Sequence, residues 1–213
     1  MDVGSETRMR AEQRLRDAII DGEMAPGHRL VDVDLVGMLC ISRSAVRLVI
    51  DTLVTEGLAE RVPNRGARVR VVTTEQAVAM TECRMVLEVL LARRAADRIT
   101  EPEIVELRAA LERVRAAVQS GDVVTCSRLV QQLYAHLHTA ARQPVAAALL
   151  DRLQAQLVTH QFRLSLRPGR SQVSLAELTA LVGAIADRDG DQAAAAVSDH
   201  FRGMITALRA EPA

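Results

Sequence analysis

Aromatic residues are almost absent from this sequence of 213 residues, which has no tryptophan, one tyrosine (Tyr134) and two phenylalanines (Phe162 and Phe201). Since 49% of the residues are hydrophobic, the core must be built from Leu, Val, Ala, Ile and Met. Such a core favours packed helices over a β-sandwich. Lysine is missing as well, so all 27 basic residues are arginine. This reflects either a coding bias or a use of guanidinium groups on phosphates and guanine edges.

Long hydrophobic runs are also missing, because charged residues interrupt even the most apolar region, residues 80–96. This excludes a membrane span, and Asp2 and Glu6, with no apolar segment behind them, exclude a signal peptide. The three cysteines are odd in number and far apart within apolar helical patterns: Cys40, Cys83 and Cys126. We expect buried, reduced thiols rather than a disulfide or zinc framework, and a cytoplasmic protein.

The formal net charge of the whole chain is zero, but the segment 41–72 is locally basic. It holds six arginines against three acidic residues: Arg43, Arg47, Arg61, Arg65, Arg68 and Arg70 against Asp51, Glu56 and Glu60. A local basic surplus on one candidate motif is typical of a nucleic-acid interface.

The first third of the chain has the element order of a winged helix-turn-helix. A helix over 8–22 is followed by a Pro-Gly turn. Next comes a short helix that ends at Leu39, with Asp32 or Asp34 as its N-cap, and then a helix over 43–57 with Ser42 as its N-cap. Alternating residues on either side of Pro63-Asn64-Arg65-Gly66 then predict a two-stranded β-ribbon. Thr74 is placed to cap the next helix, so we expect a DNA-binding domain over 1–74.

The remainder, 75–213, is predicted to be an antiparallel all-helical bundle that binds an effector and dimerises. Helices are expected over 75–98, 101–119, 122–142, 145–166, 172–188 and 190–209, separated by segments rich in Pro, Gly and Asp. The fold class is therefore mainly α, with three helices and a β-hairpin in front of the bundle.

Within the winged domain, the second helix of the pair can enter the major groove of double-stranded DNA. Ser42, Arg43, Ser44 and Arg47 lie in its first turn, where side chains and free backbone N–H groups meet phosphates and base edges. The wing tip offers Asn64, Arg65 and Gly66. The alternative is that Arg43 and Arg47 form only a solvated helix face.

These residues resemble the GntR family of bacterial regulators. The resemblance rests on the turn GEMAPG, the segment SRSAVR and the wing PNRG. It implies that Ser42, Arg43, Ser44 and Arg47 contact operator DNA and that Gly66 lets the wing approach the minor groove. One position departs from the family pattern, because Val33 stands where the family often has an arginine.

The C-terminal part resembles the FCD sensor domain of the FadR-type subfamily, in ECRMVLEVLLARRAA, LYAHLHTAARQPV and SLAELTALVGAIADRDGDQAAAAVSDHF. In many such domains an Asp and three His hold a divalent metal, but the matching positions here are Val130, Tyr134, Leu178 and His200. Val and Leu offer no electron pairs, so we expect sensing without metal. The alternative is a metal held by His136 or His138.

By the same resemblance, Arg84, Tyr134 and His200 line an effector cavity, in which the Arg84 guanidinium would pair with a carboxylate or acyl ligand. Arg84 could instead form a salt bridge with Glu88, one helical turn away.

The sequence therefore predicts a homodimeric repressor or activator, with repression favoured, whose operator affinity depends on a small organic acid or acyl effector. The alternative is a regulator that has lost ligand sensing and acts constitutively or through a protein partner. An enzyme is not expected, because Cys126, His136, His138 and His160 have no recognised catalytic spacing and no phosphate-binding loop is present.

Overall fold

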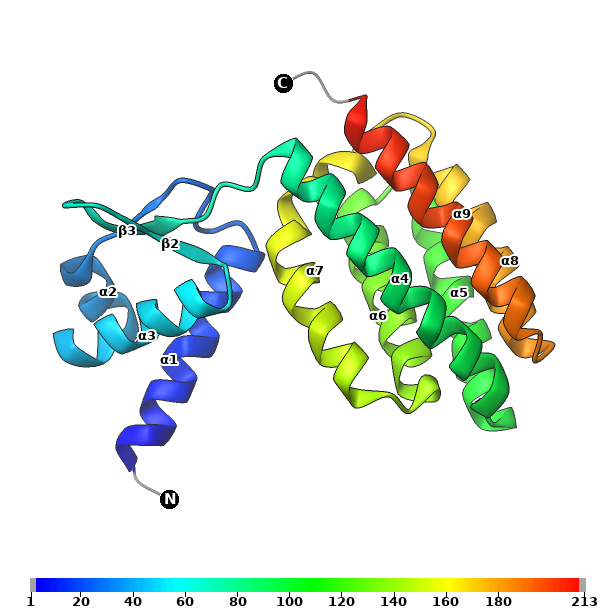
Figure 1. The fold of residues 1–213 in the computed structure, drawn as a ribbon, viewed down its shortest axis with the longest axis horizontal. Coiled ribbons are helices and arrows are strands. Elements are labelled where there is room, and N and C mark those ends of the chain that lie inside the picture. The colour runs from blue at the N-terminus through cyan, green and yellow to red at the C-terminus, as the bar shows by residue number, and fades with distance from the viewer. Residues whose placement is uncertain (1–2, 211–213) are drawn as a thin grey trace. The chain divides into compact units, whose positions relative to one another are not determined.

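A computed structural model describes residues 3–210, except for the side chains of 3–5, 158, 159, 161–163 and 165. The chain divides into two compact units, residues 1–73 with 154–159 and residues 74–153 with 160–213. Helices dominate both units (Figure 1). The predicted fold class is confirmed: three helices and a small antiparallel sheet precede a bundle of longer helices.

The helices of the first unit are α1 (Val3–Ile20), α2 (Asp32–Leu39) and α3 (Arg43–Thr55). Their inward faces form one apolar core with the sheet, in which Leu15, Val46 and Leu53 are completely buried. The apolar face predicted for α3, which includes Val49 and Ile50, is therefore confirmed.

The sheet of the first unit has three strands in the order β1-β3-β2: β1 (Arg29–Leu30), β2 (Ala59–Val62) and β3 (Gly66–Val69). The expected two-stranded ribbon is present as β2 and β3, with Val62 opposite Gly66. The prediction of two strands alone was wrong, because Arg29 and Leu30 pair with Arg68 and Ala67. A strand of two residues is too short to show an alternating pattern, so the sequence carried no signal for it.

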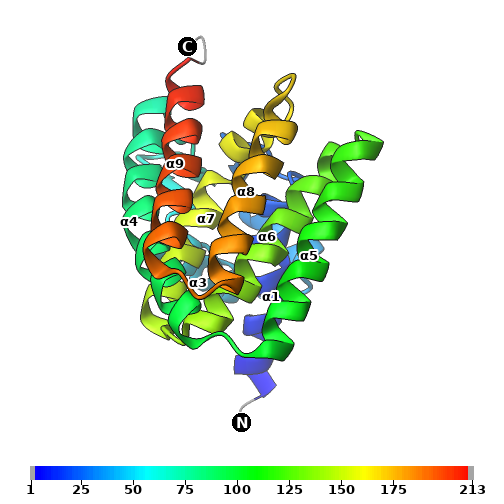
Figure 2. The ribbon, with the colours of Figure 1, turned by 90° about the vertical axis from the view of Figure 1, so that its right-hand side faces the viewer.

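The helices of the second unit are α4 (Thr74–Arg98), α5 (Glu101–Ser120), α6 (Val123–Ala141), α7 (Pro144–Ser165) apart from its residues 154–159, α8 (Arg170–Ala186) and α9 (Gly190–Arg209). All six were predicted to within about two residues, since Gly, Pro and Asp punctuate their ends. Figure 2 shows α9 between α4 and α8, and α4 also packs against α6. Leu133, Leu137, Leu178 and Phe201 are among the fully buried side chains of this core.

Two local expectations were wrong. Neither Asp32 nor Asp34 caps α2: its N-cap is Val31, which forms no side-chain cap bond, and Asp32 instead accepts a hydrogen bond from Arg47.

The three cysteines are free as expected, but only Cys126 is buried, while Cys40 and Cys83 are exposed. Cys40 ends α2 in the left-handed region, and Cys83 lies on the outward face of α4, so an apolar neighbourhood in sequence did not imply burial for either residue.

Among the residues that the structure describes, we find no helix long and apolar enough to cross a lipid bilayer.

Candidate DNA-binding and ligand sites

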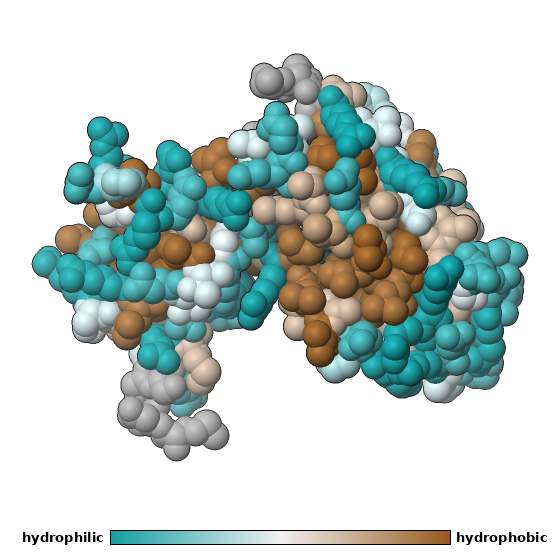
Figure 3. All heavy atoms as spheres, viewed as in Figure 1, coloured by the Kyte–Doolittle hydropathy of each residue, from teal (hydrophilic) through white to brown (hydrophobic). Residues whose placement is uncertain are grey.

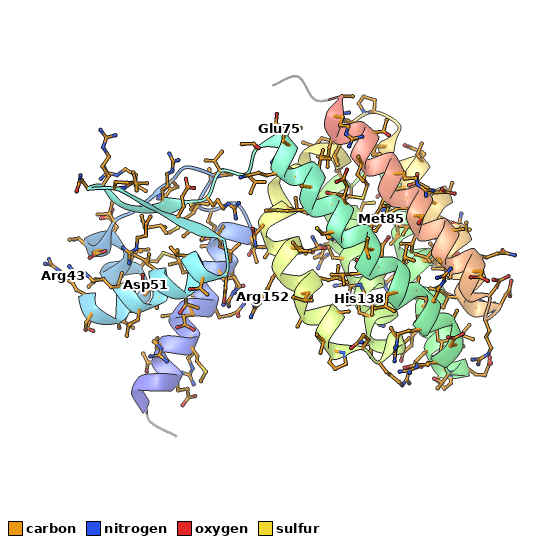
Figure 4. The ribbon with its side chains drawn as sticks, viewed as in Figure 1. Arg43, Asp51, Glu75, Met85, His138 and Arg152 are labelled. Atoms are coloured by element: carbon orange, nitrogen blue, oxygen red, sulfur yellow. The ribbon has the colours of Figure 1, made fainter. Side chains whose placement is uncertain are left out.

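The first turn of α3 is open to solvent and carries the predicted DNA-binding side chains. Ser42, Arg43, Ser44 and Arg47 are all exposed, whereas Val46 and Val49, on the opposite face, are completely buried. Figure 4 shows Arg43 at the N-terminal end of α3 with its side chain directed away from the unit. The helix thus presents two guanidinium groups and its free N-terminal N–H groups on one surface.

Ser42 holds the start of α3. Its backbone is extended (φ −66°, ψ 156°), and its hydroxyl accepts a hydrogen bond from the backbone N–H of Ala45 at 3.2 Å. The predicted cap is therefore confirmed. The Ser42 and Ser44 hydroxyls also lie 3.0 Å apart, within hydrogen-bond distance. Both hydroxyls are exposed beside the N–H groups of the first turn, where the helix dipole favours an anion.

Arg47 is held in place by the neighbouring helix. Its Nε donates to the Asp32 carboxylate at 3.2 Å, while 69% of the Arg47 side chain remains exposed. An exposed pair of this kind contributes little to stability and is readily exchanged for another anion. Arg47 can therefore be oriented by Asp32 in the free protein and still bind a phosphate.

The wing tip is a three-residue turn between β2 and β3. The Arg65 N–H donates to the Val62 carbonyl at 3.0 Å, and Asn64 and Gly66 have positive φ angles of 58° and 82°. A side chain at Gly66 would meet no atom within 4 Å, so the left-handed backbone, not lack of space, favours glycine there. Asn64, Arg65 and Gly66 are all exposed, as a groove-binding tip requires.

Leu48 is a further exposed residue of α3, and the sequence pattern did not identify it as part of this surface. Leu48 follows Arg47 and is 51% exposed, although it belongs to an apolar run that is otherwise buried. Val33 on α2, the position that departs from the family pattern, is 59% exposed. Exposed apolar groups on such a surface suit contact with thymine methyl groups.

In the second unit, buried charged groups meet inside the bundle. Arg84 and Glu88 of α4 are 4% and 0% exposed, and their side chains lie 3.4 Å apart. The Glu88 carboxylate also lies 2.9 Å from Nε2 of His138 on α6, a residue labelled in Figure 4. Glu88 is thus paired on both sides. The Arg84 Nε and Nη1 atoms are buried without any hydrogen-bond partner.

Tyr134 lies at the centre of this cluster. Its ring centroid is 6.1 Å from that of His138, 6.2 Å from that of His200 and 6.3 Å from that of Phe201, and the Arg84 guanidinium lies 5.2 Å from the Phe201 ring. The Tyr134 hydroxyl is buried and has no partner. Burial raises the pKa of this phenol well above its ordinary value, with Glu88 adding to the effect, so the hydroxyl keeps its proton as a donor. The predicted effector residues Arg84, Tyr134 and His200 are therefore brought together.

A second, partly buried chain of polar groups was not foreseen from the sequence. Nδ1 of His200 on α9 lies 2.7 Å from the Glu177 carboxylate on α8, which accepts a hydrogen bond from Arg170 at 3.0 Å. Burial of Glu177 opposes ionisation, but the bond to His200 and the charges of His200 and Arg170 outweigh it and hold the pKa of Glu177 below its usual 4.5. His200 is thereby already bonded on one side.

We expect Glu177→Gln to reduce the pH dependence of stability in acid. Because the Glu177 pKa is lowered by folding, its contribution is complete above pH 4.5 and is lost as the pH falls below that value. Urea unfolding from neutral pH to about pH 3.5 should show a shallower decline for Glu177→Gln than for the wild type. Glu112→Gln, at a carboxylate whose side chain is 65% exposed, is the control. Equal slopes for all three proteins would contradict the assignment.

The residues at the family's metal positions do not fit a metal ion. Leu178 is completely buried in the core, Val130 packs beside it, and neither side chain can donate an electron pair. His200 is bonded to Glu177, and His138 to Glu88. The His136 side chain is 39% exposed and lies 3.9 Å from Glu106, whereas His138 lies against Glu88, so the two histidines do not share a site. Among the described side chains, no group of three or more His, Cys, Asp or Glu is arranged to hold a metal.

Comparison with known families gives two matches that together span most of the chain. Residues 7–69 match the model described as "Bacterial regulatory proteins, gntR family", and residues 79–203 match the FCD domain. The boundary between the two matches lies where the helical bundle begins.

Individual relatives match the chain over most of their length. The chain is 25% identical over 195 residues to the HTH-type transcriptional repressor RspR of Escherichia coli K12, covering 92% of this chain and 86% of the relative. The solved structure of E. coli McbR/YncC superimposes with a TM-score of 0.81 at 19% identity, over 95% of this chain and 97% of that one. A putative GntR regulator from Rhodococcus sp. RHA1 gives a TM-score of 0.73 at 22% identity, over 98% and 100%.

Proposed function

We propose that this chain, which belongs to the gntR family of bacterial regulatory proteins and carries an FCD domain, is a homodimeric repressor. Its affinity for a two-fold symmetric operator changes when a small organic acid or acyl compound binds the FCD domain. The members of this family are transcription regulators and not enzymes. The FCD match supports the FadR-type subfamily, and the name of RspR supports repression.

The exposed first turn of α3 is the observation that carries the DNA-binding part of this proposal. Arg43 and Arg47 project from a helix end that Ser42 caps, and the buried face of the same helix anchors it in the core. Base edges are read by arginine in the major groove, while phosphates bind the N-terminal N–H groups. Leu48, Asn64 and Arg65 extend this surface. Selection of bound genomic fragments by the purified protein tests it, since recovery of no enriched sequence would contradict the proposal.

The unpartnered buried donors around Tyr134 carry the ligand-binding part. Two Arg84 nitrogens and the Tyr134 hydroxyl are donors without acceptors, and such groups are costly to bury. A carboxylate supplies acceptors for all three without a metal, because the charge that neutralises it is the guanidinium itself. Ligand binding and DNA binding are then linked: an effector that prefers the state unable to bind DNA must weaken operator affinity.

We expect Arg84→Gln to abolish stabilisation by ligands. In a thermal-shift screen of small mono- and dicarboxylates and acyl-CoA compounds, a compound present at 100 times its Kd should stabilise the wild type by about 2.7 kcal/mol. The same compound should have no effect on Arg84→Gln. Tyr134→Phe, which keeps the ring, should bind more weakly, and exposed Arg108→Gln should match the wild type.

The alternative function, a regulator without ligand sensing, has an observation in its favour: Arg84 already donates to Glu88 through Nη2. That reading requires the Arg84 guanidinium to be purely structural. If no carboxylate, acyl compound or metal ion shifts the melting temperature of the wild type while specific DNA binding persists, the alternative is correct and the effector part of the proposal is wrong.

A further inference from the structure

Among the described residues of α3, Leu48 is the one large apolar side chain that is exposed, although the two residues after it, Val49 and Ile50, are buried. Its neighbours on the exposed side of the helix are polar, namely Ser44, Arg47 and Asp51. Figure 3 shows that the surface of the first unit is largely hydrophilic in this view, with smaller hydrophobic areas among the charged groups. A half-exposed leucine is common on protein surfaces, and its meaning depends on what covers it.

Leu48 lies within the surface that meets DNA in the proposed function. It follows Ser44 by four residues, so the two side chains lie on the same side of α3. Leu48 is about 6 Å further along the helix axis than Ser44. Arg43 and Arg47 are related by the same spacing. A helix that places these arginines on base edges in the major groove therefore brings Leu48 against the neighbouring base pairs.

The polar neighbours of Leu48 are already held by ion pairs in the free protein. Arg47 donates to the Asp32 carboxylate at 3.2 Å, and Asp51 pairs with Arg61 of β2 at 2.5 Å. The second pair offsets the charge of Asp51, which would otherwise repel phosphates. The Leu48 side chain has neither a charge nor a hydrogen-bonding group, so it contributes to DNA binding only through apolar contact.

The major groove offers one apolar group for such a contact, the C5 methyl group of thymine. Against a thymine, Leu48 buries this methyl group together with its own side chain. Against the amino groups of adenine and cytosine, or against O6 of guanine, it would displace water without replacing the lost hydrogen bonds, which is costly. A leucine at this position therefore favours one base and disfavours the other three.

We propose that Leu48 is a specificity-determining residue, which selects thymine at one position of each operator half-site through contact with the C5 methyl group. The inference rests on the proposed function, because it requires that α3 reads operator DNA. It adds a base that the arginines do not account for, since arginine binds the O6 and N7 atoms of guanine.

Selection of bound DNA from a random library, by the wild type and by Leu48 variants, tests the base preference. The wild-type consensus should contain a thymine position at which Leu48→Ala accepts every base, while the guanine positions persist. Leu48→Met, which conserves the apolar volume, should retain the thymine. Met9→Ala is the matched control, because Met9 lies on α1 of the same unit and is 52% exposed. It should give the wild-type consensus, and all variants should fold normally because both positions are exposed.

Replacing the selected thymine by deoxyuridine removes the methyl group alone and keeps the base pair. The affinity of the wild type should fall about fourfold for one half-site and about 15-fold for both, as expected for one buried carbon group in each copy. Leu48→Ala should bind both DNAs equally. Its salt dependence should equal that of the wild type, because no phosphate contact is lost.

The possible results separate this inference from the proposed function. A loss of the methyl effect in Leu48→Ala, with unchanged salt dependence, would support the contact. A wild-type consensus without such a thymine, equal binding of the thymine and deoxyuridine operators, or a methyl effect that persists in Leu48→Ala would overturn the role of Leu48 and leave the proposed function standing. Recovery of no enriched sequence by the wild type would overturn both.

Discussion

Replacing Arg43 and Arg47 together by alanine is expected to lower the affinity for operator DNA by at least about 30-fold, and the loss should be largest for the specific site. Each arginine that binds a base edge with two hydrogen bonds contributes about 1–3 kcal/mol of discrimination, and the double variant loses both contacts in each copy. Titration of a labelled operator fragment at several salt concentrations measures the effect. The salt dependence should become shallower by about one unit for each phosphate contact removed.

The double variant should fold normally, because both side chains are exposed and the Arg47–Asp32 pair is a surface interaction. Arg108→Ala with Arg113→Ala is the matched control: it removes the same charge from exposed positions on α5, in the other unit. That variant should bind operator DNA as the wild type does. If Arg43→Ala with Arg47→Ala binds with unchanged affinity and salt dependence, the α3 surface is not the DNA-binding site.

Replacing Phe201 by alanine should destabilise the helical bundle by about 3–5 kcal/mol. Phe201 is completely buried, and its ring is 5.5 Å from His200 and 6.3 Å from Tyr134, with the Arg84 guanidinium 5.2 Å away. Protein interiors are close-packed, and the neighbours of a deleted side chain relax only partly into the gap. The loss of Phe201 therefore leaves a void that aliphatic neighbours cannot fill.

Tyr134 makes this measurement selective. It is the single tyrosine in a chain without tryptophan, so intrinsic fluorescence reports urea unfolding of the bundle alone. The comparison is made at one protein concentration, because dimerisation affects apparent stability. Val173→Ala on α8, at a residue that is 50% exposed, should change the unfolding free energy by less than about 0.5 kcal/mol. A Phe201→Ala midpoint close to that of the wild type would show that the ring is not a packing centre of the bundle.

Short-range chemistry explains what could be predicted. Ser42 was expected to cap α3, and it does, because a cap depends on residues three apart in sequence. The buried positions Val46, Val49, Ile50 and Leu53 follow from helical periodicity, and the ends of the bundle helices from Gly, Pro and Asp. The wing turn was equally local. Each of these features lies within one helix or one turn.

Long-range pairing explains what could not be predicted. β1 exists only because Arg29 and Leu30 meet residues 67 and 68, far along the chain. Glu177 joins His200 because α8 packs against α9, and no motif marks that pair. For Arg84, the sequence left a salt bridge and a ligand contact as alternatives. The structure contains the first and also leaves two nitrogens without partners.

The sequence by itself determined an aliphatic, mainly helical protein, because it has few aromatic residues and no long apolar runs. It also determined that a basic winged segment comes before a helical bundle. Composition and periodicity suffice for this, because helices and turns form from neighbouring residues. Only the tertiary structure decided which polar groups are buried together around Tyr134, and that Cys83 lies on the outer face of α4 instead of in the core. Burial is a property of packing between helices, and the sequence of one helix does not specify which of its apolar faces the others cover.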